Sequence, residues 1–571
     1  MPRTPLLRAI RKLFHDAHLA RRAGLALSDL PELRDEGLNP RNARYLGGAG
    51  ANASESGTRT RRQRQGQGID RRTVLAAAGA GIGAGALALG APRVAHAKGQ
   101  PTIAIVGGGI SGLSCALTLA DHGYASTVYE TSGRIGGRMF SNTTTWDQSQ
   151  VSEWCGELID TAHTTILGLA KRFHLPIDNL HKAEPRRSED TYRFFGHYYR
   201  QSRATADFLG KVASRVYHEA NDTPYPTTFD SEYNKLTSEL NSMSVFDWIE
   251  TRVPGGHRSD LGQLLDVAYN IEYGADTTDQ AALNLVYLLG FQPDDVSLSI
   301  FGASDETFHI RGGNQRLPVA IANKLQNVEY GYAMQKLAAT PGGRYQLTFG
   351  TSGGAVDVTA DFVVLALPFA VLRGLDTSGA GFDKLKEKAI DELGRGRNGK
   401  TQLQFTSRLW NQHGAWYGVS NGSSYSDTGY QAGWDVTRAQ PGSAGIMVFY
   451  SGGSTTGAME ATQAYSAITA PGVLADATTA LQRAEPVFPG LTALWNGKAT
   501  QSLPHKSPQF GASYSYWRVG QYREFAGYEG VAQGRVLFCG EHTSQDFQGF
   551  MEGGASEGVR AAGDLIHMIR G

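Results

Sequence analysis

Cysteine is scarce in this chain, with three residues among 571: Cys115, Cys155 and Cys539. Three thiols are too few to build a disulfide framework, even in an exported protein. Each lies in an apolar or glycine-rich stretch, which predicts buried, structural side chains. Stability must then come from hydrophobic burial, and a 41% hydrophobic content can supply a large core shared between two or three domains.

An excess of one charge is also absent, since 54 Lys and Arg balance 54 Asp and Glu. The balance is uneven along the chain, because basic residues outnumber acidic ones in residues 1–97 and the remainder is mildly acidic. An acidic body disfavours binding to the phosphate backbone of nucleic acids. We therefore expect no nucleic-acid partner.

No apolar run is long and pure enough to be a good membrane span. The best candidate lies in "DRRTVLAAAGAGIGAGALALGAPRVAHA", which is under about 20 residues long and rich in glycine. Arg71 and Arg72 precede this run, and an A-x-A-like site ends at Ala97. The segment resembles a twin-arginine signal peptide, so we expect contact with the export machinery, cleavage near Ala97 and a periplasmic or secreted protein. A retained membrane anchor is the alternative.

A nucleotide-hydrolysing P-loop is disfavoured although "GRGRNGKT", residues 394–401, fits G-x-x-x-x-G-K-[ST]. A P-loop needs a strand before the glycines and a helix after them. Here "FDKLKEKAIDEL" upstream has helical spacing, and "TQLQFTSRLW" downstream alternates like a half-buried strand. The order is helix, loop, strand, so Lys400 needs another explanation.

The chain beyond residue 97 begins with a dinucleotide-binding pattern, "PTIAIVGGGISGLSCALTLADHGYASTVYE". A short apolar strand leads into Gly107, Gly109 and Gly112, then into a helix and a second strand that ends at Glu130. Gly107 suits a tight turn, Gly109 lets the backbone approach a pyrophosphate, and Gly112 permits close helix packing. Glu130 would accept hydrogen bonds from the adenosine ribose.

The following stretch, "ETSGRIGGRMFS", decides between dinucleotides. A second Gly-Arg loop directly after the ribose-binding acid is of no use to a nicotinamide enzyme, but it can close over the pyrophosphate of a buried FAD. The stretch resembles the E-x-x-x-R-x-G-G-R signature of the flavin-containing amine oxidase superfamily, which includes monoamine, polyamine and L-amino-acid oxidases.

The resemblance continues through "FHIRGGNQRLPVAIANKL", "NVEYGYAMQKL", "DFVVLALP" and "GRVLFCGEHTSQDFQGFMEGGASEGVRAAGDLI". It implies that Met334 lies near the adenine and that Glu541 binds the ribityl or pyrophosphate region. The FAD contacts that it implies are Gly107, Gly109, Ser111, Gly112, Glu130, Gly137, Arg138, Gly156, Glu157, Met334, Gly540, Glu541, Phe550 and Met551.

The resemblance also implies the fold class, which is α/β with a Rossmann-like FAD-binding domain interleaved with an α+β substrate-binding domain. We assign residues 98–172, 301–372 and 506–571 to the FAD-binding domain. Residues 173–300 and 373–505, which are rich in aromatic residues, form the predicted substrate-binding domain.

Three residues are implied at the reaction centre. The segment "LGRGRNGKTQLQF" resembles the one that places a lysine beside flavin N5, where it holds a water; this maps onto Lys400. A surface lysine is the alternative. Tyr514 and Phe550 match the two aromatic faces that flank the substrate nitrogen. Flavin-linking relatives carry a cysteine just before the first aromatic, whereas this chain has Ser513, so the FAD should be non-covalent.

The substrate is less clearly indicated. L-amino-acid oxidases resemble "WCGELIDTAH" but place a carboxylate-binding arginine where Ile159 stands, although Arg518 or Arg316 could replace it. Glu157 and Asp160 lie where polyamine oxidases use an acid to recruit a distal amine, or they bind backbone groups as ordinary loop carboxylates.

The leading hypothesis is an FAD-dependent oxidase of a primary or secondary amine that delivers imine and, with O2, hydrogen peroxide, and that needs no metal. An L-amino-acid oxidase is the alternative. A flavin-dependent desaturase is disfavoured, because it needs neither Lys400 nor Tyr514.

Overall fold

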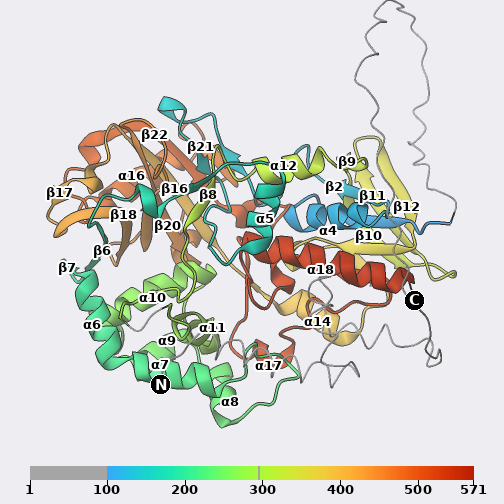
Figure 1. The fold of residues 1–571 in the computed structure, drawn as a ribbon, viewed down its shortest axis with the longest axis horizontal. Coiled ribbons are helices and arrows are strands. Elements are labelled where there is room, and N and C mark those ends of the chain that lie inside the picture. Colours follow the sequence, from blue (N-terminus) through green and yellow to red (C-terminus); the bar gives the residue numbers. More distant parts are fainter. Residues whose placement is uncertain (1–98, 294–295, 571) are drawn as a thin grey trace, which may run out of the picture.

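A five-stranded parallel sheet forms one end of the molecule (Figure 1). The computed structural model describes residues 99–293 and 296–570. All neighbouring strands of the sheet are parallel. Their order is β24 (Val536–Phe538), β13 (Phe362–Leu365), β1 (Ile103–Val106), β2 (Thr127–Glu130) and β9 (Val328–Tyr330). The two strands predicted before Gly107 and up to Glu130 are thereby confirmed as β1 and β2.

β1 is buried on both faces, which explains its uninterrupted apolar sequence. Ile103 and Ile105 pack with residues of the helices α4 (Ile110–Asp121) and α18 (Met551–Arg570). Ala104 and Val106 face the opposite core, which includes the sheet β12 (Gly354–Ala360), β11 (Tyr345–Thr351), β10 (Ala333–Ala339) and β14 (Asp376–Gly379).

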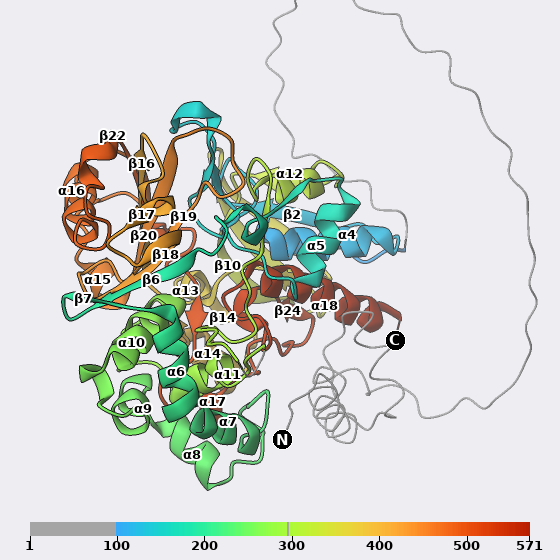
Figure 2. The same cartoon turned by 60° about the vertical axis from the view of Figure 1, so that its left-hand side comes forward.

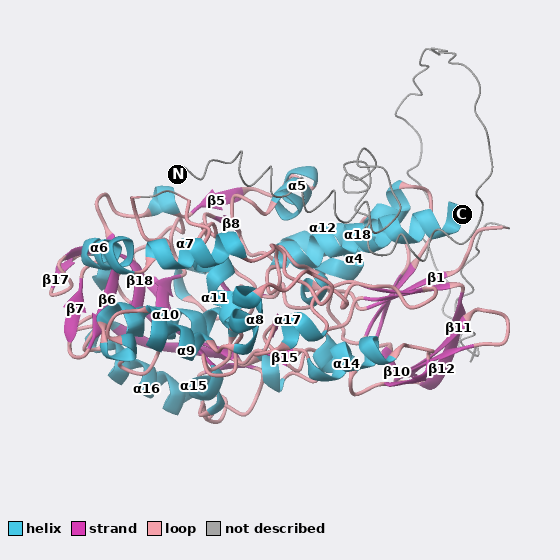
Figure 3. Cartoon of the chain, turned by 90° about the horizontal axis from the view of Figure 1, so that it is seen from below, coloured by secondary structure: helices cyan, strands magenta, loops and turns pink. Residues whose placement is uncertain are grey.

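α4 and α18 come from opposite ends of the described chain and lie side by side, as Figures 1 and 3 show. A Cβ at Gly558 of α18 would lie 2.1 Å from the carbonyl oxygen of Ser111 in α4. A Cβ atom cannot lie so close to an oxygen, so only glycine at position 558 allows the two helices to pack at this distance.

A second, nine-stranded sheet lies at the other end of the molecule. β17 (His413–Gly414) pairs with β18 at the side of its main path. That path runs β21 (Tyr465–Ala467), β22 (Trp495–Ser502), β16 (Asn398–Phe405), β20 (Gly445–Gly452), β19 (Ala432–Asp435), β18 (Gly418–Ser426), β6 (Glu189–Phe194) and β7 (His197–Tyr199).

The helix–loop–strand order around residues 394–401 is confirmed, because α14 (Lys384–Glu392) precedes β15 (Gly394–Arg395) and β16. The expectation of a half-buried strand was wrong, since all eight residues of β16 are buried. Its apolar side packs into a core with Phe449 and Phe488. Its polar side is covered by the segment 147–157, whose backbone carbonyls at Cys155 and Glu153 accept hydrogen bonds from Lys400 and Gln402.

A block of helices packs beside the nine-stranded sheet and against it through α10 (Figure 2). It comprises α6 (Gln201–Lys211), α7 (Ala213–Asp222), α8 (Lys235–Ser242), α9 (Val245–Arg252), α10 (Asp260–Tyr273) and α11 (Ala282–Leu289). Other elements that bear on the site are β4 (Ser152–Glu153), α5 (Thr164–Arg172), β8 (Phe308–Ile310), α12 (Arg316–Ala322), α16 (Val473–Ala484) and β23 (Ser515–Tyr516).

These two ends confirm the predicted α/β class, with a Rossmann-like sheet and a second, mixed region. The five strands of the parallel sheet fall within the segments assigned to the FAD-binding domain, and the nine-stranded sheet falls within the other two segments. The domain boundaries themselves stay a prediction. The signal peptide predicted up to Ala97 lies outside the described residues, and within these no helix is long and apolar enough to cross a membrane.

Candidate active site

One cavity of about 590 Å³ runs between the carboxyl ends of the parallel strands and the nine-stranded sheet. It is lined by every residue predicted for the site except Gly112. These lining residues are Gly107, Gly109, Ser111, Glu130, Gly137, Arg138, Gly156, Glu157, Met334, Lys400, Tyr514, Gly540, Glu541, Phe550 and Met551. Segments more than 400 residues apart in the sequence thus meet around one space.

The three glycines of the first motif have separate structural roles. Gly107 has a φ of +110°, and a Cβ there would lie 2.6 Å from the carbonyl oxygen of Ala366. A Cβ at Gly112 would lie 2.1 Å from the carbonyl oxygen of Gly107, so this residue seats α4 and lies outside the cavity lining. At Gly109 a Cβ would meet nothing nearer than 4.0 Å and would project into the cavity.

Gly109 is also the N-cap of α4, and no side chain caps this helix end. The N–H groups of the first turn and the partial positive charge of a helix N-terminus favour an anion such as a pyrophosphate. The site therefore fits a dinucleotide at this point, because the backbone is bare where the phosphates would approach.

Glu130 is buried at the end of β2 and already accepts three hydrogen bonds. Its Oε2 accepts from the backbone N–H of Gly108 at 2.8 Å. Its Oε1 accepts from the backbone N–H and the hydroxyl of Ser132, at 2.8 and 2.7 Å. These bonds fix the carboxylate at the edge of the cavity, and its remaining lone pairs can accept from ribose hydroxyls.

Arg138 and Glu541 form an ion pair in the same cavity, with 3.0 Å between Arg138 Nη1 and Glu541 Oε1. Arg138 also donates to the carbonyl oxygen of Ser513 at 2.7 Å, and Glu541 Oε2 accepts from the Ser515 hydroxyl at 2.7 Å. Burial alone would raise the pKa of Glu541, but Arg138 and the surrounding donors outweigh it and lower the pKa. Glu541 is therefore a carboxylate at neutral pH.

Lys400 is 6% exposed, which rules out the surface-lysine alternative. Its Nζ lies 2.6 Å from Glu157 Oε2 and donates to the carbonyl oxygen of Cys155 at 2.7 Å. Glu157 Oε1 accepts from Trp434 Nε1 at 2.9 Å. Burial opposes the ionisation of Glu157, but the Lys400 cation outweighs it and the pKa of Glu157 is lowered.

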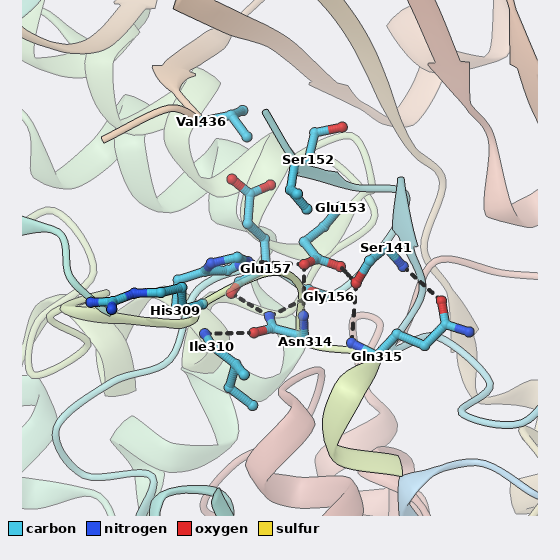
Figure 4. A network of polar contacts seen from close by, with 12 residues as sticks. Ser141, Ser152, Glu153, Gly156, Glu157, His309, Ile310, Asn314, Gln315 and Val436 are labelled. Carbon is cyan, nitrogen blue, oxygen red and sulfur yellow. Dashed lines mark hydrogen bonds and ion pairs between the residues drawn. The ribbon is translucent and has the colours of Figure 1, made fainter. Parts of the chain in front are cut away.

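A buried polar network holds the loop that carries Glu157 (Figure 4). The side-chain amide of Asn314 donates to the carbonyl oxygens of Gly156 and Glu157, at 3.1 and 2.7 Å. Glu153 accepts from the backbone N–H of Asn314 at 2.8 Å and lies 2.9 Å from His309 Nε2. Burial opposes the charge of His309, but Glu153 raises its pKa overall.

Aromatic side chains line the cavity near Lys400. The hydroxyl of Tyr514 donates to the carbonyl oxygen of Ile271 at 2.8 Å, and Tyr450 lies 3.2 Å from that hydroxyl. The rings of Tyr450 and Trp434 are 5.2 Å apart and nearly perpendicular. Phe550 also lines the cavity and makes an edge contact with His163. Tyr514 is thereby held in one orientation.

Several expectations from the sequence need correction. Cys115 and Cys539 are buried, but Cys155 is partly exposed, lines the cavity and places its sulfur 3.2 Å from the Tyr465 hydroxyl. Its carbonyl oxygen accepts a hydrogen bond from Lys400 of β16, so this residue belongs to the wall of the site.

The two arginines offered as carboxylate ligands are also misplaced. Arg518 pairs with Asp279 on the surface, and Arg316 donates to a backbone carbonyl; neither lines the cavity. The two acids differ as well. Asp160 accepts from the backbone N–H of Glu306, as a loop carboxylate would, whereas Glu157 pairs with Lys400.

The sequence did not single out five further cavity residues. Trp434 in β19 and Tyr450 in β20 lie within the aromatic-rich segment 373–505, and that richness was the available signal. The remaining three are charged and lie in segments without a motif: Glu272, Glu306 and Arg438. Within the described residues, no group of three or more His, Cys, Asp or Glu side chains could hold a metal ion.

Comparison with known proteins finds relatives in sequence and a similar fold among solved structures. YobN of Bacillus subtilis, which is named as an L-amino-acid oxidase, is 23% identical over 81% of this chain and 93% of its own length. Polyamine oxidase 2 of Arabidopsis thaliana is 24% identical over 81% of this chain and 88% of its own. The structure of cyclohexylamine oxidase from Brevibacterium oxydans superposes with a TM-score of 0.68 at 18% identity, covering 83% of this chain and all of that one.

The model of the family described as flavin containing amine oxidoreductase matches residues 110–566, which is most of the chain. The match spans both the parallel sheet and the nine-stranded sheet, and the cavity between them has the bare glycine turn and the paired charges that a flavin dinucleotide requires. This protein is therefore a member of that family, an oxidoreductase of amines that uses a flavin.

Proposed function

We propose that the protein is an oxidase of primary or secondary amines with a non-covalent FAD. A bound flavin would supply the two-electron oxidation of the amine to an imine, with N5 as acceptor of the hydride equivalent and O2 as the final oxidant that gives hydrogen peroxide. The observation that carries the proposal is the buried Lys400–Glu157 pair beside Tyr514, in the cavity whose other end has the glycine turn and Glu130.

Lys400 supplies a fixed positive charge on a buried side chain of the cavity wall. A cation that is already in place stabilises negative charge that develops near it during the reaction, because the surrounding groups do not have to rearrange first. Glu157 holds the Nζ in position and Trp434 holds Glu157, so the charge has one location.

Tyr514 and Phe550 would orient the substrate nitrogen with ring faces, which fix an amine without removing its lone pair. The Tyr514 hydroxyl is already committed to the Ile271 carbonyl, so this residue offers its ring and not its proton. Glu130, Arg138 and Glu541 would hold the ribose and pyrophosphate side of FAD.

An L-amino-acid oxidase has less support, although one relative carries that name. Arg438 lines the cavity and could face a carboxylate, but it pairs with Glu184 at 2.9 Å and so lacks a free charge. A desaturase would leave the Lys400–Glu157 pair and the aromatic faces without a role.

The test is peroxide release and anaerobic flavin bleaching on a panel of monoamines, diamines and L-amino acids. We expect amines to bleach the flavin and to produce peroxide on admission of air. Turnover of amino acids alone would support the alternative, and bleaching without reoxidation by air would contradict the oxidase assignment.

A further inference from the structure

Two carboxyl groups in the cavity have no hydrogen-bond or ion-pair partner among the residues that the structure describes. Glu272 is the penultimate residue of α10, and Glu306 lies in the loop before β8. Both line the cavity. Within the described residues, neither side chain accepts a hydrogen bond or forms an ion pair, in contrast to the other acids around this space.

The cationic side chains that line the cavity already have partners within the protein. Lys400 pairs with Glu157, Arg138 with Glu541, and Arg438 with Glu184. Arg134 lies on the glycine side, where it donates to the Gly137 carbonyl and covers the Phe140 ring. The cavity therefore holds two carboxyl groups, Glu272 and Glu306, for which the described residues supply no paired cation.

The backbone of Glu306 is held firmly. It has a φ of +45°, and its N–H donates to Asp160 Oδ1 at 2.9 Å. The preceding Asp305 accepts from the backbone N–H of Thr161 at 2.8 Å, and its carbonyl oxygen lies 2.6 Å from His181 Nε2. A left-handed backbone at a glutamate is retained only where surrounding contacts impose it.

The electrostatics agree with an absent counter-charge. Burial raises the pKa of Glu306 to about 7, with Asp160, Glu157 and Asp190 adding to the rise and Arg438 opposing it. Burial, then Glu306 and Asp160, raises the pKa of Glu272 well above its usual range. Burial, and then Glu306, Asp190 and Glu272, raise the pKa of Tyr425, which lines the same cavity. A cation placed there would favour the charged carboxylates.

We infer that Glu306, supported by Glu272, is a specificity-determining residue that binds a second cationic group of the substrate, away from the carbon being oxidised. The substrate class is then a diamine, or an amine with a remote ammonium or guanidinium group. The inference rests on the proposed function, because it assumes that the reacting amine lies beside Lys400 and Tyr514.

The test compares each amine that bleaches the flavin with its analogue carrying a terminal second ammonium group. The measured quantity is the ratio of kcat/KM for the dication to kcat/KM for the monocation, between pH 6 and pH 8. A carboxyl with a pKa near 7 ionises about tenfold more at pH 8 than at pH 6. We expect this ratio to rise about tenfold in the parent enzyme and to stay flat in Glu306→Gln.

A second readout needs no turnover. Alkyltrimethylammonium and bis(trimethylammonium)alkane ions of equal chain length keep a fixed charge, so titrating the flavin spectrum with them reports on the enzyme alone. Preference for the dication should increase with pH and be lost in Glu306→Gln. The matched control is Glu189→Gln on the exposed start of β6, which should behave like the parent.

The outcomes separate the two proposals. If monoamines bleach the flavin but the dication ratio is the same in Glu306→Gln and the parent, the inference is wrong and the proposed function stands. If no amine bleaches the flavin, the proposed function fails, while the quaternary ions still report whether Glu306 selects a dication.

Discussion

At the residue scale, the role of Lys400 depends on its ion pair with Glu157. A buried ammonium without a counter-ion loses its proton, and a buried carboxylate alone gains one. Lys400 Nζ lies 2.6 Å from Glu157 Oε2 and lowers the pKa of that carboxyl, so removing Lys400 also changes the charge of Glu157.

We therefore expect Lys400→Met to keep its FAD but to react slowly. The ribose and pyrophosphate contacts lie elsewhere, whereas losing one fixed charge near a developing anion costs about 3 kcal/mol, or roughly a hundredfold in rate. Glu157 would lose the cation that lowers its pKa and become protonated. Stopped-flow spectra under amine, and then under O2, would show which half-reaction slows.

Lys498→Met is the control, since Lys498 pairs with Asp147 away from the cavity and should react like the parent. Parent rates in Lys400→Met with full FAD content would refute the assignment. Loss of nucleotide binding together with unchanged flavin chemistry would revive the P-loop hypothesis.

At the scale of secondary-structure elements, the position of α4 depends on Gly112, which packs against the backbone of Gly107 and does not line the cavity. We expect Gly112→Ala to lower both stability and FAD retention, because its Cβ would require the Gly107 carbonyl, 2.1 Å away, to move. Overpacking of this kind costs about 1–3 kcal/mol. Thermal unfolding and the ratio of flavin to protein absorbance would measure the two effects.

Gly133→Ala is the matched control in the neighbouring loop, where a Cβ would have no atom within 4 Å. It should leave both quantities unchanged. Equal behaviour of the two variants would show that α4 does not depend on this close contact.

Elements were more predictable from the sequence than side-chain partners. The strand, glycine turn and helix at residues 103–121 follow from local pattern alone, because apolar period and backbone sterics act over a few residues. The pairing of Lys400 with Glu157 joins positions 243 residues apart, so only the assembled fold reveals it.

Glu272, Glu306 and Arg438 belong to no motif, and the sequence held no local signal for them. The burial of β16 was misjudged for a related reason. Its alternating polar residues indicate a solvent-exposed face, but here they meet the backbone of residues 147–157. The alternation of polar and apolar residues along a strand does not reveal whether its polar face meets water or a polar loop of the protein.

At the scale of the whole molecule, the flavin would be held by the fold and not by a covalent bond. Ser513 offers a hydroxyl that donates to Asn398, and the only thiol lining the described cavity is that of Cys155. We expect acid precipitation to release all FAD into the supernatant. Flavin in the pellet would contradict this, and Cys155→Ser would then show whether that thiol is the link.

We also propose that the protein is exported by the twin-arginine route, which carries folded proteins. Arg71→Lys combined with Arg72→Lys should leave active, flavin-loaded enzyme in the cytoplasm. Fractionation followed by a peroxide assay measures this, with Arg61→Lys and Arg62→Lys as the matched control pair that should not alter export. Normal export of the first variant would show that the segment is not such a signal.

The pairing of α4 with α18 has a consequence for biosynthesis. Glu541 and α18, which also line the cavity, are synthesised after the glycine turn and Glu130, with most of the described chain between them. A nascent or truncated chain that stops before Glu541 therefore lacks part of the cofactor site. Bound flavin, and with it yellow colour, would then mark a polypeptide whose synthesis has passed α18.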